Sequence, residues 1–197
     1  MKIVAITQRV DIQNLNGEKR DCLDSNWYKL FEELGIAIII LPNNINLIDR
    51  TFSLNRIDGI ILSGGGDLYD KDNRLECEQH LINISIKRNL PLVGVCRGMQ
   101  SINSYFGGIM TRIKGHVRSR HKIKLINRED RVVNSFHNFS IQQDNLGENL
   151  ISLAYDQDNN VELFKHSRFK IYGMMWHPER QPRGSLASSA LTKAILH

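Results

Sequence analysis

The sequence lacks a long apolar run. None approaches the roughly 20 residues that a helix needs to cross a membrane, so no membrane association is expected. The N-terminal segment 1–6 is too short for a signal peptide and has no small-residue cleavage site, and it is expected to form a core strand instead. These absences predict a cytoplasmic protein.

Cysteine is also scarce. The three cysteines are Cys22, Cys77 and Cys96, an odd number without the spacing of metal ligands. This usage favours reduced thiols, which agrees with a cytoplasmic location. We interpret Cys22 and Cys77 as structural or exposed bystanders.

Two nucleotide-binding motifs are missing. The glycine triplet 64–66 lacks the Gly-Lys-Ser/Thr ending of a P-loop, and no G-x-G-x-x-G opens a helix. No internal repeat, low-complexity tract or linker interrupts the chain either. At 197 residues the sequence therefore predicts one domain spanning 1–197.

Positive charge is in excess. The chain has 26 Lys+Arg against 21 Asp+Glu, a net charge of +5, and its clearest basic cluster runs from Arg112 to Lys124. Because the cluster has no interleaved aromatic residues and no binding motif, nucleic-acid binding is not expected. Two explanations stay open: a solvated loop and strand face, or contact with a phosphate-bearing small substrate.

Strand-like and helical segments alternate to about residue 110. This alternation predicts an α/β fold, with a flavodoxin-like, mostly parallel sheet flanked by helices. The polar residues 10–21 are predicted to form a loop. The expected strands are 2–7, 36–41 (covered on both faces), 59–62 and 92–95, and the expected helices are 27–34, 75–88 and the segment after residue 96.

The chain changes in character after residue 110. Five short strand-like segments are predicted to form a small mixed or antiparallel extension, followed by a closing helix at 185–196. The five segments are 122–126, 131–133, 150–154, 161–165 and 170–175.

One stretch, 91–100, is the centre of the functional prediction. A buried strand runs directly into Cys96, and Gly94 and Gly98 leave room for a sharp strand-to-helix turn. A cysteine there projects from the carboxyl end of a sheet, at a helix N-terminus whose dipole favours a thiolate. The alternative is that Cys96 is simply a small buried core residue.

A cysteine nucleophile needs a base and a group that orients the base. His177 emerges from the apolar run 171–176, is fixed by Pro178, and has Glu179 two residues later. Alone, His-Pro-Glu is as compatible with a turn as with a catalytic pair. In a chain that also has a cysteine on a sharp strand-to-helix turn, the tripeptide predicts a Cys96–His177–Glu179 triad.

An oxyanion hole needs two preorganised N–H groups. The N–H of Arg97, directly after the cysteine, is one candidate. The loop 63–66 can supply another without side-chain crowding, although a glycine triplet could equally be a plain turn or a phosphate cradle.

These motifs together resemble the class I glutamine amidotransferase superfamily. The resemblance rests on Ser63-Gly-Gly, on Gly94-Val-Cys-Arg-Gly-Met-Gln100 followed by Phe106-Gly-Gly, and on His177-Pro-Glu. Asn134-Ser-Phe-His137 and the spacing of His116 and His121 resemble its γ-glutamyl hydrolase branch, typified by γ-glutamyl-γ-aminobutyrate hydrolase. The resemblance covers essentially the whole chain.

The resemblance implies an acyl transfer through Cys96, His177 and Glu179, with the N–H groups of Gly65 and Arg97 as the oxyanion hole. It implies release of glutamate from a small γ-glutamyl substrate and no metal or organic cofactor. The substrate-binding residues predicted on this basis are Gly64, Gly66, Gln100, Asn134, Ser135, Phe136, His137 and Arg9. A homodimer is a possible assembly.

The chain departs from the γ-aminobutyrate-type hydrolases. It is shorter, and it reads His137-Asn-Phe where they more often continue with His-Gln. Gln8-Arg9, Arg20-Asp21 and Trp27 resemble a smaller group, the γ-glutamyl-CDP-amidate hydrolases of capsular phosphoramidate biosynthesis. In that group, Arg9, Arg20 or the segment 118–120 would meet an anionic diphosphate.

Other functions remain open from the sequence. The histidine of Phe136-His-Asn-Phe139 is at least as often a structural residue as a pocket residue, and His116 and His121 could order the basic loop or be solvated. The chain could instead be a glutaminase subunit that supplies ammonia to a partner synthetase. It could also be a non-catalytic binding module on the same fold.

Overall fold

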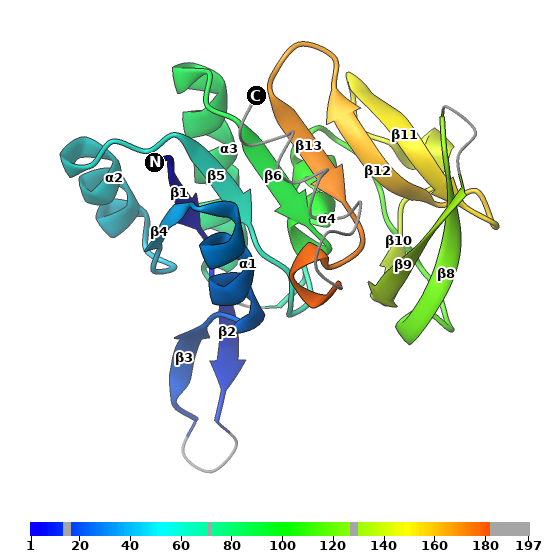
Figure 1. The fold of residues 1–197 in the computed structure, drawn as a ribbon, viewed down its shortest axis with the longest axis horizontal. Helices are drawn as coiled ribbons and strands as arrows, with labels where there is room; N and C mark the ends of the chain where they lie inside the picture. The colour runs from blue at the N-terminus through cyan, green and yellow to red at the C-terminus, as the bar shows by residue number, and fades with distance from the viewer. Residues whose placement is uncertain (14–16, 71, 127–129, 182–197) are drawn as a thin grey trace.

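The computed structural model describes residues 1–197 except 14–16, 71, 127–129 and 182–197 (Figure 1). Nine strands form one sheet in the order β4-β1-β5-β6-β13-β12-β11-β8-β9. The strands are β1 Ile3–Ile6, β4 Ala37–Ile40, β5 Gly59–Leu62, β6 Leu92–Val95, β8 Val117–Leu125, β9 Asp130–Phe136, β11 Leu150–Asp156, β12 Val161–His166 and β13 Ile171–Met174. The predicted closing helix lies outside the described residues.

Two small sheets and the helices complete the described fold. The small sheets pair β2 Arg9–Ile12 with β3 Lys19–Cys22, and β7 Thr111–Arg112 with β10 Phe139–Ser140. The α-helices are α1 Asn26–Leu34, α2 Ile45–Leu54, α3 Arg74–Arg88 and α4 Arg97–Tyr105, and the 3-10 turns are η1 Gln143–Asn145 and η2 Pro178–Arg180. None of the helices in the described ranges is long and apolar enough to cross a membrane.

The sheet has a parallel half and an antiparallel half. In the first half, β1 pairs in parallel with β4 and β5, and β6 pairs in parallel with β5 and β13. In chain order these strands read 2-1-3-4-5, which is the flavodoxin-like order. Beyond β13, the strands β12, β11, β8 and β9 pair antiparallel. The predicted fold class is confirmed, and the extension continues the same sheet.

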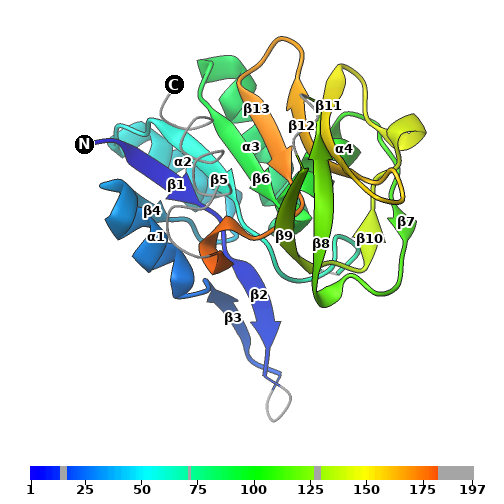
Figure 2. The same cartoon turned by 45° about the vertical axis from the view of Figure 1, so that its right-hand side comes forward.

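Helices cover both faces of the parallel half (Figures 1 and 2). The apolar stripe of α1, which includes Trp27 and Phe31, packs against Val4 and Ile61 on one face. Helices α2, α3 and α4 pack on the other face. The predicted α1 stripe is confirmed, and the helix ends at Gly35 in a left-handed conformation (φ 62°).

Two sequence expectations differ from the structure, and one helix was not predicted. Residues 9–12 and 19–22 form a β-hairpin rather than a loop. The hairpin is hard to predict because its strands are short, mostly polar and mostly exposed. The strand at 37–40 lies at the sheet edge and is only partly buried, since an apolar run alone does not separate a central strand from an edge strand. Helix α2 was not anticipated.

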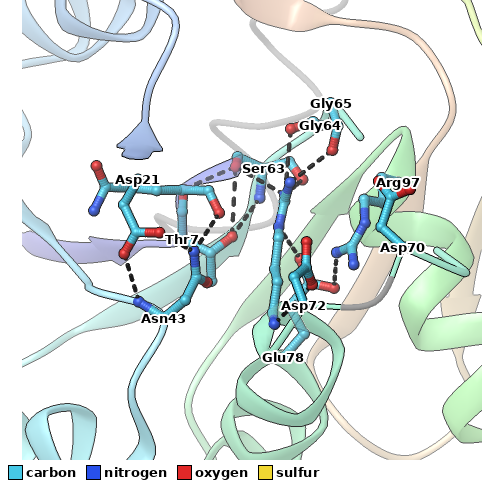
Figure 3. Close-up of polar contacts among 12 residues, drawn as sticks. Thr7, Asp21, Asn43, Ser63, Gly64, Gly65, Asp70, Asp72, Glu78 and Arg97 are labelled. Atoms are coloured by element: carbon cyan, nitrogen blue, oxygen red, sulfur yellow. Dashed lines mark hydrogen bonds and ion pairs between the residues drawn. The ribbon is translucent and has the colours of Figure 1, made fainter. Parts of the chain in front are cut away.

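The hairpin projects from the body of the fold, and its base is fastened to the sheet (Figures 1 and 3). The carboxylate of Asp21 accepts hydrogen bonds from the backbone N–H and the side-chain amide of Asn43, at 2.9 and 2.8 Å. The Asn43 amide also donates to the carbonyl of Gln8. These contacts hold Arg9, the first residue of β2, beside the end of β1.

The turn at Cys96 depends on close packing of α4 against the sheet. A Cβ on Gly98 would lie 2.1 Å from the carbonyl oxygen of Leu62, and a Cβ on Gly94 would lie 2.4 Å from the carbonyl oxygen of Gly98. No real Cβ tolerates such contacts. The prediction that both glycines are required by the elbow is supported by these distances.

We expect Gly98→Ala to destabilise the fold by about 1–3 kcal/mol or more, because backbone atoms cannot move aside as a flexible side chain would. Urea unfolding measures the change. Ser104→Ala on the same helix is the control, because it adds no atoms. Equal stability of the two variants would contradict the packing argument.

Candidate active site

A cavity of about 370 Å³ lies where β5, β6 and β13 reach their carboxyl ends. This is the edge at which parallel α/β sheets carry their ligands. The described residues that line it are Arg9, Gly65, Gly66, Asp67, Cys96, Arg97, Gln100, Phe136, His137, Asn138, Phe139, His177 and Arg180.

Cys96 sits on the strained turn that the sequence predicts. It follows β6 directly, precedes α4, and has φ 51°, a left-handed conformation that side chains rarely adopt. Its N–H donates to the carbonyl of Met174 on β13, at 2.8 Å, which holds the turn against the neighbouring strand. Strain of this kind concentrates at functional sites.

His177 contacts both Cys96 and Glu179. Its Nδ1 lies 2.6 Å from Oε1 of Glu179, and both side chains are almost completely buried. Burial by itself lowers the pKa of the imidazole, but the negative charge and hydrogen bond of Cys96, together with Glu179, outweigh it and raise the pKa of His177 to about 10. The three predicted triad residues therefore lie in one connected chain.

Asn134 clamps the main chain of His177. Its Oδ1 accepts from the N–H of His177 at 2.8 Å, and its Nδ2 donates to the carbonyl of His177 at 2.9 Å. The hydroxyl of Ser135 donates to the carbonyl of His116. Neither residue is among the described ones that line the cavity, and their predicted part in substrate binding stays a prediction. Asn134 positions the histidine.

The glycine loop after β5 closes on the same centre. A Cβ on Gly64 would lie 2.5 Å from Cε1 of His177, so only glycine allows this approach. Gly65 and Gly66 have φ 87° and 75° and line the cavity. The structure thus brings the predicted oxyanion loop next to Cys96 and His177.

Arg74 on α3 fixes this loop from behind, a role that sequence reasoning missed. Its guanidinium donates to the carbonyls of Ser63, Gly64 and Gly65 at 2.5, 3.2 and 2.6 Å (Figure 3). Because the N–H of a trans peptide points away from its carbonyl, the amides of Gly65 and Gly66 face away from Arg74. Arg74 itself is 1% exposed.

A single buried carboxylate holds two arginines in place. Glu78 accepts from Nε of Arg74 at 2.9 Å and from Nη1 of Arg97 at 2.5 Å. Arg97 also donates to the carbonyl of Asp67. Since Arg97 directly follows Cys96, this network joins the cysteine turn to the glycine loop.

The other predicted binding residues divide into two groups. Gln100, Phe136, His137 and Arg9 line the cavity. Burial lowers the pKa of His137 to about 4 despite a hydrogen bond to the carbonyl of Phe139, so this ring is neutral. The three remaining arginine candidates are exposed and are not among the described lining residues: Arg20, Arg118 and Arg120.

Arg180 lines the cavity and was not predicted by the sequence analysis. Its guanidinium lies 4.7 Å from the ring centroid of Phe136 and bonds the carboxylate of Asp24 at 3.0 Å. No local sequence pattern predicts the contact between Arg180 and Asp24, because the two residues are 156 positions apart in the chain. Arg180 and Arg9 both line the cavity, and each is ion-paired with a carboxylate, Asp24 and Asp11 respectively.

The glutamine amidotransferase class-I family model matches residues 20–188. The chain belongs to this family. A γ-glutamyl-CDP-amidate hydrolase from Campylobacter jejuni is 37% identical to it over 185 residues, covering 90% of each chain.

Other members of the class-I glutamine amidotransferase family are similar as well. A subunit of the glutamine-hydrolysing GMP synthase of Methanococcus vannielii is 33% identical over 152 residues, covering 74% of this chain and 76% of that protein. A crystal structure of a glutamine amidotransferase from Thermotoga maritima has the same fold, with a TM-score of 0.67 at 18% identity, over 98% of this chain and 82% of that one. The predicted family is confirmed, and the chain is an enzyme of this family.

The raised pKa of His177 makes stability depend on pH. The folded pKa of His177 lies above its unfolded value of about 6.5. The contacts of His177 with Cys96 and Glu179 therefore stabilise the fold fully below about pH 6.5, and this stabilisation is lost as the pH rises to about 10. Glu179→Gln removes one contact that raises this pKa. We expect the gap in unfolding free energy between wild type and Glu179→Gln to be largest near about pH 6 and to shrink toward about pH 9.5.

Urea unfolding of both proteins across this range measures the gap. Glu76→Gln, which changes a carboxylate of α3 outside the triad, should show a small gap without this trend. A gap for Glu179→Gln that grows with pH would contradict the assignment.

The Arg74 network predicts a large stability effect. Arg74→Met leaves the fully buried Glu78 with one cation instead of two and leaves three loop carbonyls unbonded, so we expect a loss of about 3–5 kcal/mol in urea unfolding. Arg56→Met is the matched control: its ion pair with Asp58 is exposed, with 70% of the arginine side chain accessible, and its loss should change stability much less than the loss of Arg74. Similar values for both variants would refute the network's importance.

Proposed function

We propose that the chain hydrolyses a γ-glutamyl amide bond and releases L-glutamate. The observation that carries this proposal is the connected series Cys96–His177–Glu179, which lies at the carboxyl edge of the sheet and opens into a cavity beside the glycine loop. Family membership supports it, because the C. jejuni relative is named as a hydrolase.

Each residue then has a chemical role. The thiolate of Cys96 attacks the γ-carbonyl carbon, and the N–H groups of Gly65 and Arg97 stabilise the oxyanion that forms. As the C–N bond breaks, protonated His177 gives its proton to the leaving nitrogen, and a γ-glutamyl thioester remains on Cys96. His177 next takes a proton from water, whose oxygen attacks the thioester carbonyl; the C–S bond then breaks, glutamate leaves, and the Cys96 thiolate is regenerated beside protonated His177. Glu179 orients His177 and stabilises its charged form.

The proposed substrate is γ-glutamyl-CDP-amidate, and the second product is cytidine diphosphoramidate, used in capsule polysaccharide biosynthesis. The name of the C. jejuni relative supports this choice. The position of Arg9 supports it as well, because its side chain is 45% exposed beside Gly65 and could exchange its ion pair with Asp11 for one with a diphosphate. Gln100 and the backbone near Phe136 would hold the glutamyl end.

A second candidate is a glutaminase subunit that supplies ammonia to a synthetase. The relation to the M. vannielii protein favours it, since that protein is named as one subunit of a glutamine-hydrolysing GMP synthase. This function predicts weak glutamine hydrolysis by the chain alone and stimulation by a partner. A different γ-glutamyl amine, such as γ-glutamyl-γ-aminobutyrate, is a third substrate class for the same chemistry.

Glutamate release from a panel of substrates tests the proposal. The panel contains glutamine, γ-glutamyl-γ-aminobutyrate, a γ-glutamyl peptide and γ-glutamyl-CDP-amidate. We expect the nucleotide conjugate to be the best substrate and Cys96→Ala to lower its turnover by at least about 10⁴-fold. Arg9→Gln should raise KM for the nucleotide conjugate about 10-fold and leave glutamine turnover nearly unchanged.

The matched control is Cys22→Ala, because Cys22 lies on the hairpin outside the triad and should keep full activity. Turnover that persists in Cys96→Ala would refute the mechanism. A preference for an uncharged amine would keep the mechanism and reject the nucleotide substrate. Silence on all four substrates, with activity restored by a synthetase, would favour the second candidate.

A further inference from the structure

A second cluster of ionisable side chains lies beside the cavity, in the antiparallel half of the sheet. His116 directly precedes β8, His121 lies within β8, His137 follows β9, and Glu162 lies on β12. The three histidines and the carboxylate come from three different strands or their ends, yet their side chains converge. None of them belongs to the Cys96–His177–Glu179 series.

The distances show how closely they converge. Nε2 of His121 lies 3.3 Å from Oε2 of Glu162, and Nε2 of His137 lies 3.6 Å from Oε1. One ligand atom from each of His116, His121 and Glu162 can be chosen so that all lie within 4.8 Å of one another, whereas His137 lies outside this set of three and approaches it through Glu162. The ring centroid of His116 is 5.0 Å from those of His121 and His137, with the rings tilted rather than stacked.

The polar atoms of this cluster lack the partners that buried groups need. Within the described part of the chain, no hydrogen bond is made by Nδ1 of His116, by either ring nitrogen of His121, by Nε2 of His137, or by either oxygen of Glu162. The side chains of His137 and Glu162 are each 1% exposed. An unsatisfied carboxylate at this depth is costly, so these atoms need partners that the described side chains do not supply, such as ordered water or a cation.

One outer contact holds a ring of the cluster as metal ligands are usually held. Nδ1–H of His137 donates to the carbonyl of Phe139 at 2.9 Å, so its Nε2 carries a lone pair directed at Glu162. Histidines that bind metals typically place the second nitrogen against a carbonyl or a carboxylate in this way. Nε2 of His116 lies 3.9 Å from Oδ2 of Asp156, which is too far for a hydrogen bond.

We propose that His116, His121, His137 and Glu162 bind a divalent transition-metal ion, with Zn²⁺ as the best match. Three imidazoles and one carboxylate are a donor set that Zn²⁺ takes in tetrahedral geometry. With metal–ligand bonds of about 2.0–2.1 Å, the edge of such a tetrahedron is about 3.3 Å. The observed 3.3 and 3.6 Å agree with that edge.

An ion pair without metal is the competing explanation. It would pair His121 with Glu162 across 3.3 Å and would leave Nδ1 of His116 and Nε2 of His137 unsatisfied. A cation between His116, His121 and Glu162 would give these three side chains a common partner. The geometry therefore favours a metal over a network of hydrogen bonds.

The metal would position the cavity wall and take no part in the chemistry. It would tie β8, β9 and β12 together and hold His137 with the adjoining residues 138–139, which line the cavity. Substrate would still react at Cys96. The site is thus structural, and its loss should loosen one wall of the cavity.

Metal analysis of the full chain tests the proposal without reference to activity. Protein dialysed against Zn²⁺ and then freed of loose ions should retain about one ion per chain. A strong chelator should remove it and lower the melting temperature, and Zn²⁺ should restore both. Co²⁺ added to the stripped protein should give the intense visible absorption of a tetrahedral site.

Two variants and one control locate the ion. His121→Ala and Glu162→Gln should weaken Zn²⁺ affinity about 100-fold or more, whereas His80→Ala should not, because His80 is paired with Asp49 elsewhere on the fold. A wild-type chain that retains no Zn²⁺ and gives no Co²⁺ absorption would overturn the proposal. Equal Zn²⁺ retention by folded His121→Ala would overturn it as well, because the ion would then lie elsewhere.

Discussion

The buried carboxylate of Glu78 is the constraint on which the site depends. It compensates two guanidinium groups at 0–1% side-chain exposure, and each of them reaches a different part of the centre. Arg74 holds the carbonyl side of the glycine loop, and Arg97 continues directly from the cysteine turn. A buried carboxylate with two partners has few alternative positions, so the loop and the turn are held at one mutual geometry. The donors of an oxyanion hole are useful only if they are fixed in this way before the reaction.

The local features of the site could be predicted from the sequence, and the long-range contacts could not. The strand into Cys96, the flanking glycines and the His-Pro-Glu turn each lie within about ten residues, so their spacing reveals the geometry. The clamp of Asn134 on His177 joins positions 43 residues apart and has no local pattern. The hairpin was not predicted because hydrophobic periodicity marks strands that have a buried face, and the strands of the hairpin are mostly exposed. A single domain and a homodimer stay predictions.

The basic cluster Arg112–Lys124 includes strand β8, whose two faces differ in exposure and in the residues they carry. Along β8, Ser119, His121, Ile123 and Leu125 are at least partly buried, whereas Arg118, Arg120, Lys122 and Lys124 are exposed. This is the period-two alternation of a strand with one covered face. The exposed basic residues fit the solvated-face explanation offered by the sequence. His121, on the covered face, belongs to the cluster with Glu162. The positive charge of the segment lies on the exposed face and does not reveal this cluster.

In the proposed mechanism, the parallel half of the sheet carries the reacting groups, and the antiparallel half supports His177 and forms a wall of the cavity. The parallel half carries Cys96 and the glycine loop at its strand ends, and β13, where the two halves meet, delivers His177. The antiparallel half supplies Asn134, which holds the histidine main chain, and the segment 136–139, which forms a wall of the cavity. A change in the packing of the extension is therefore expected to reach His177 as well as the wall. For this reason we expect the substrate range of the family to vary through the extension while the cysteine turn stays the same.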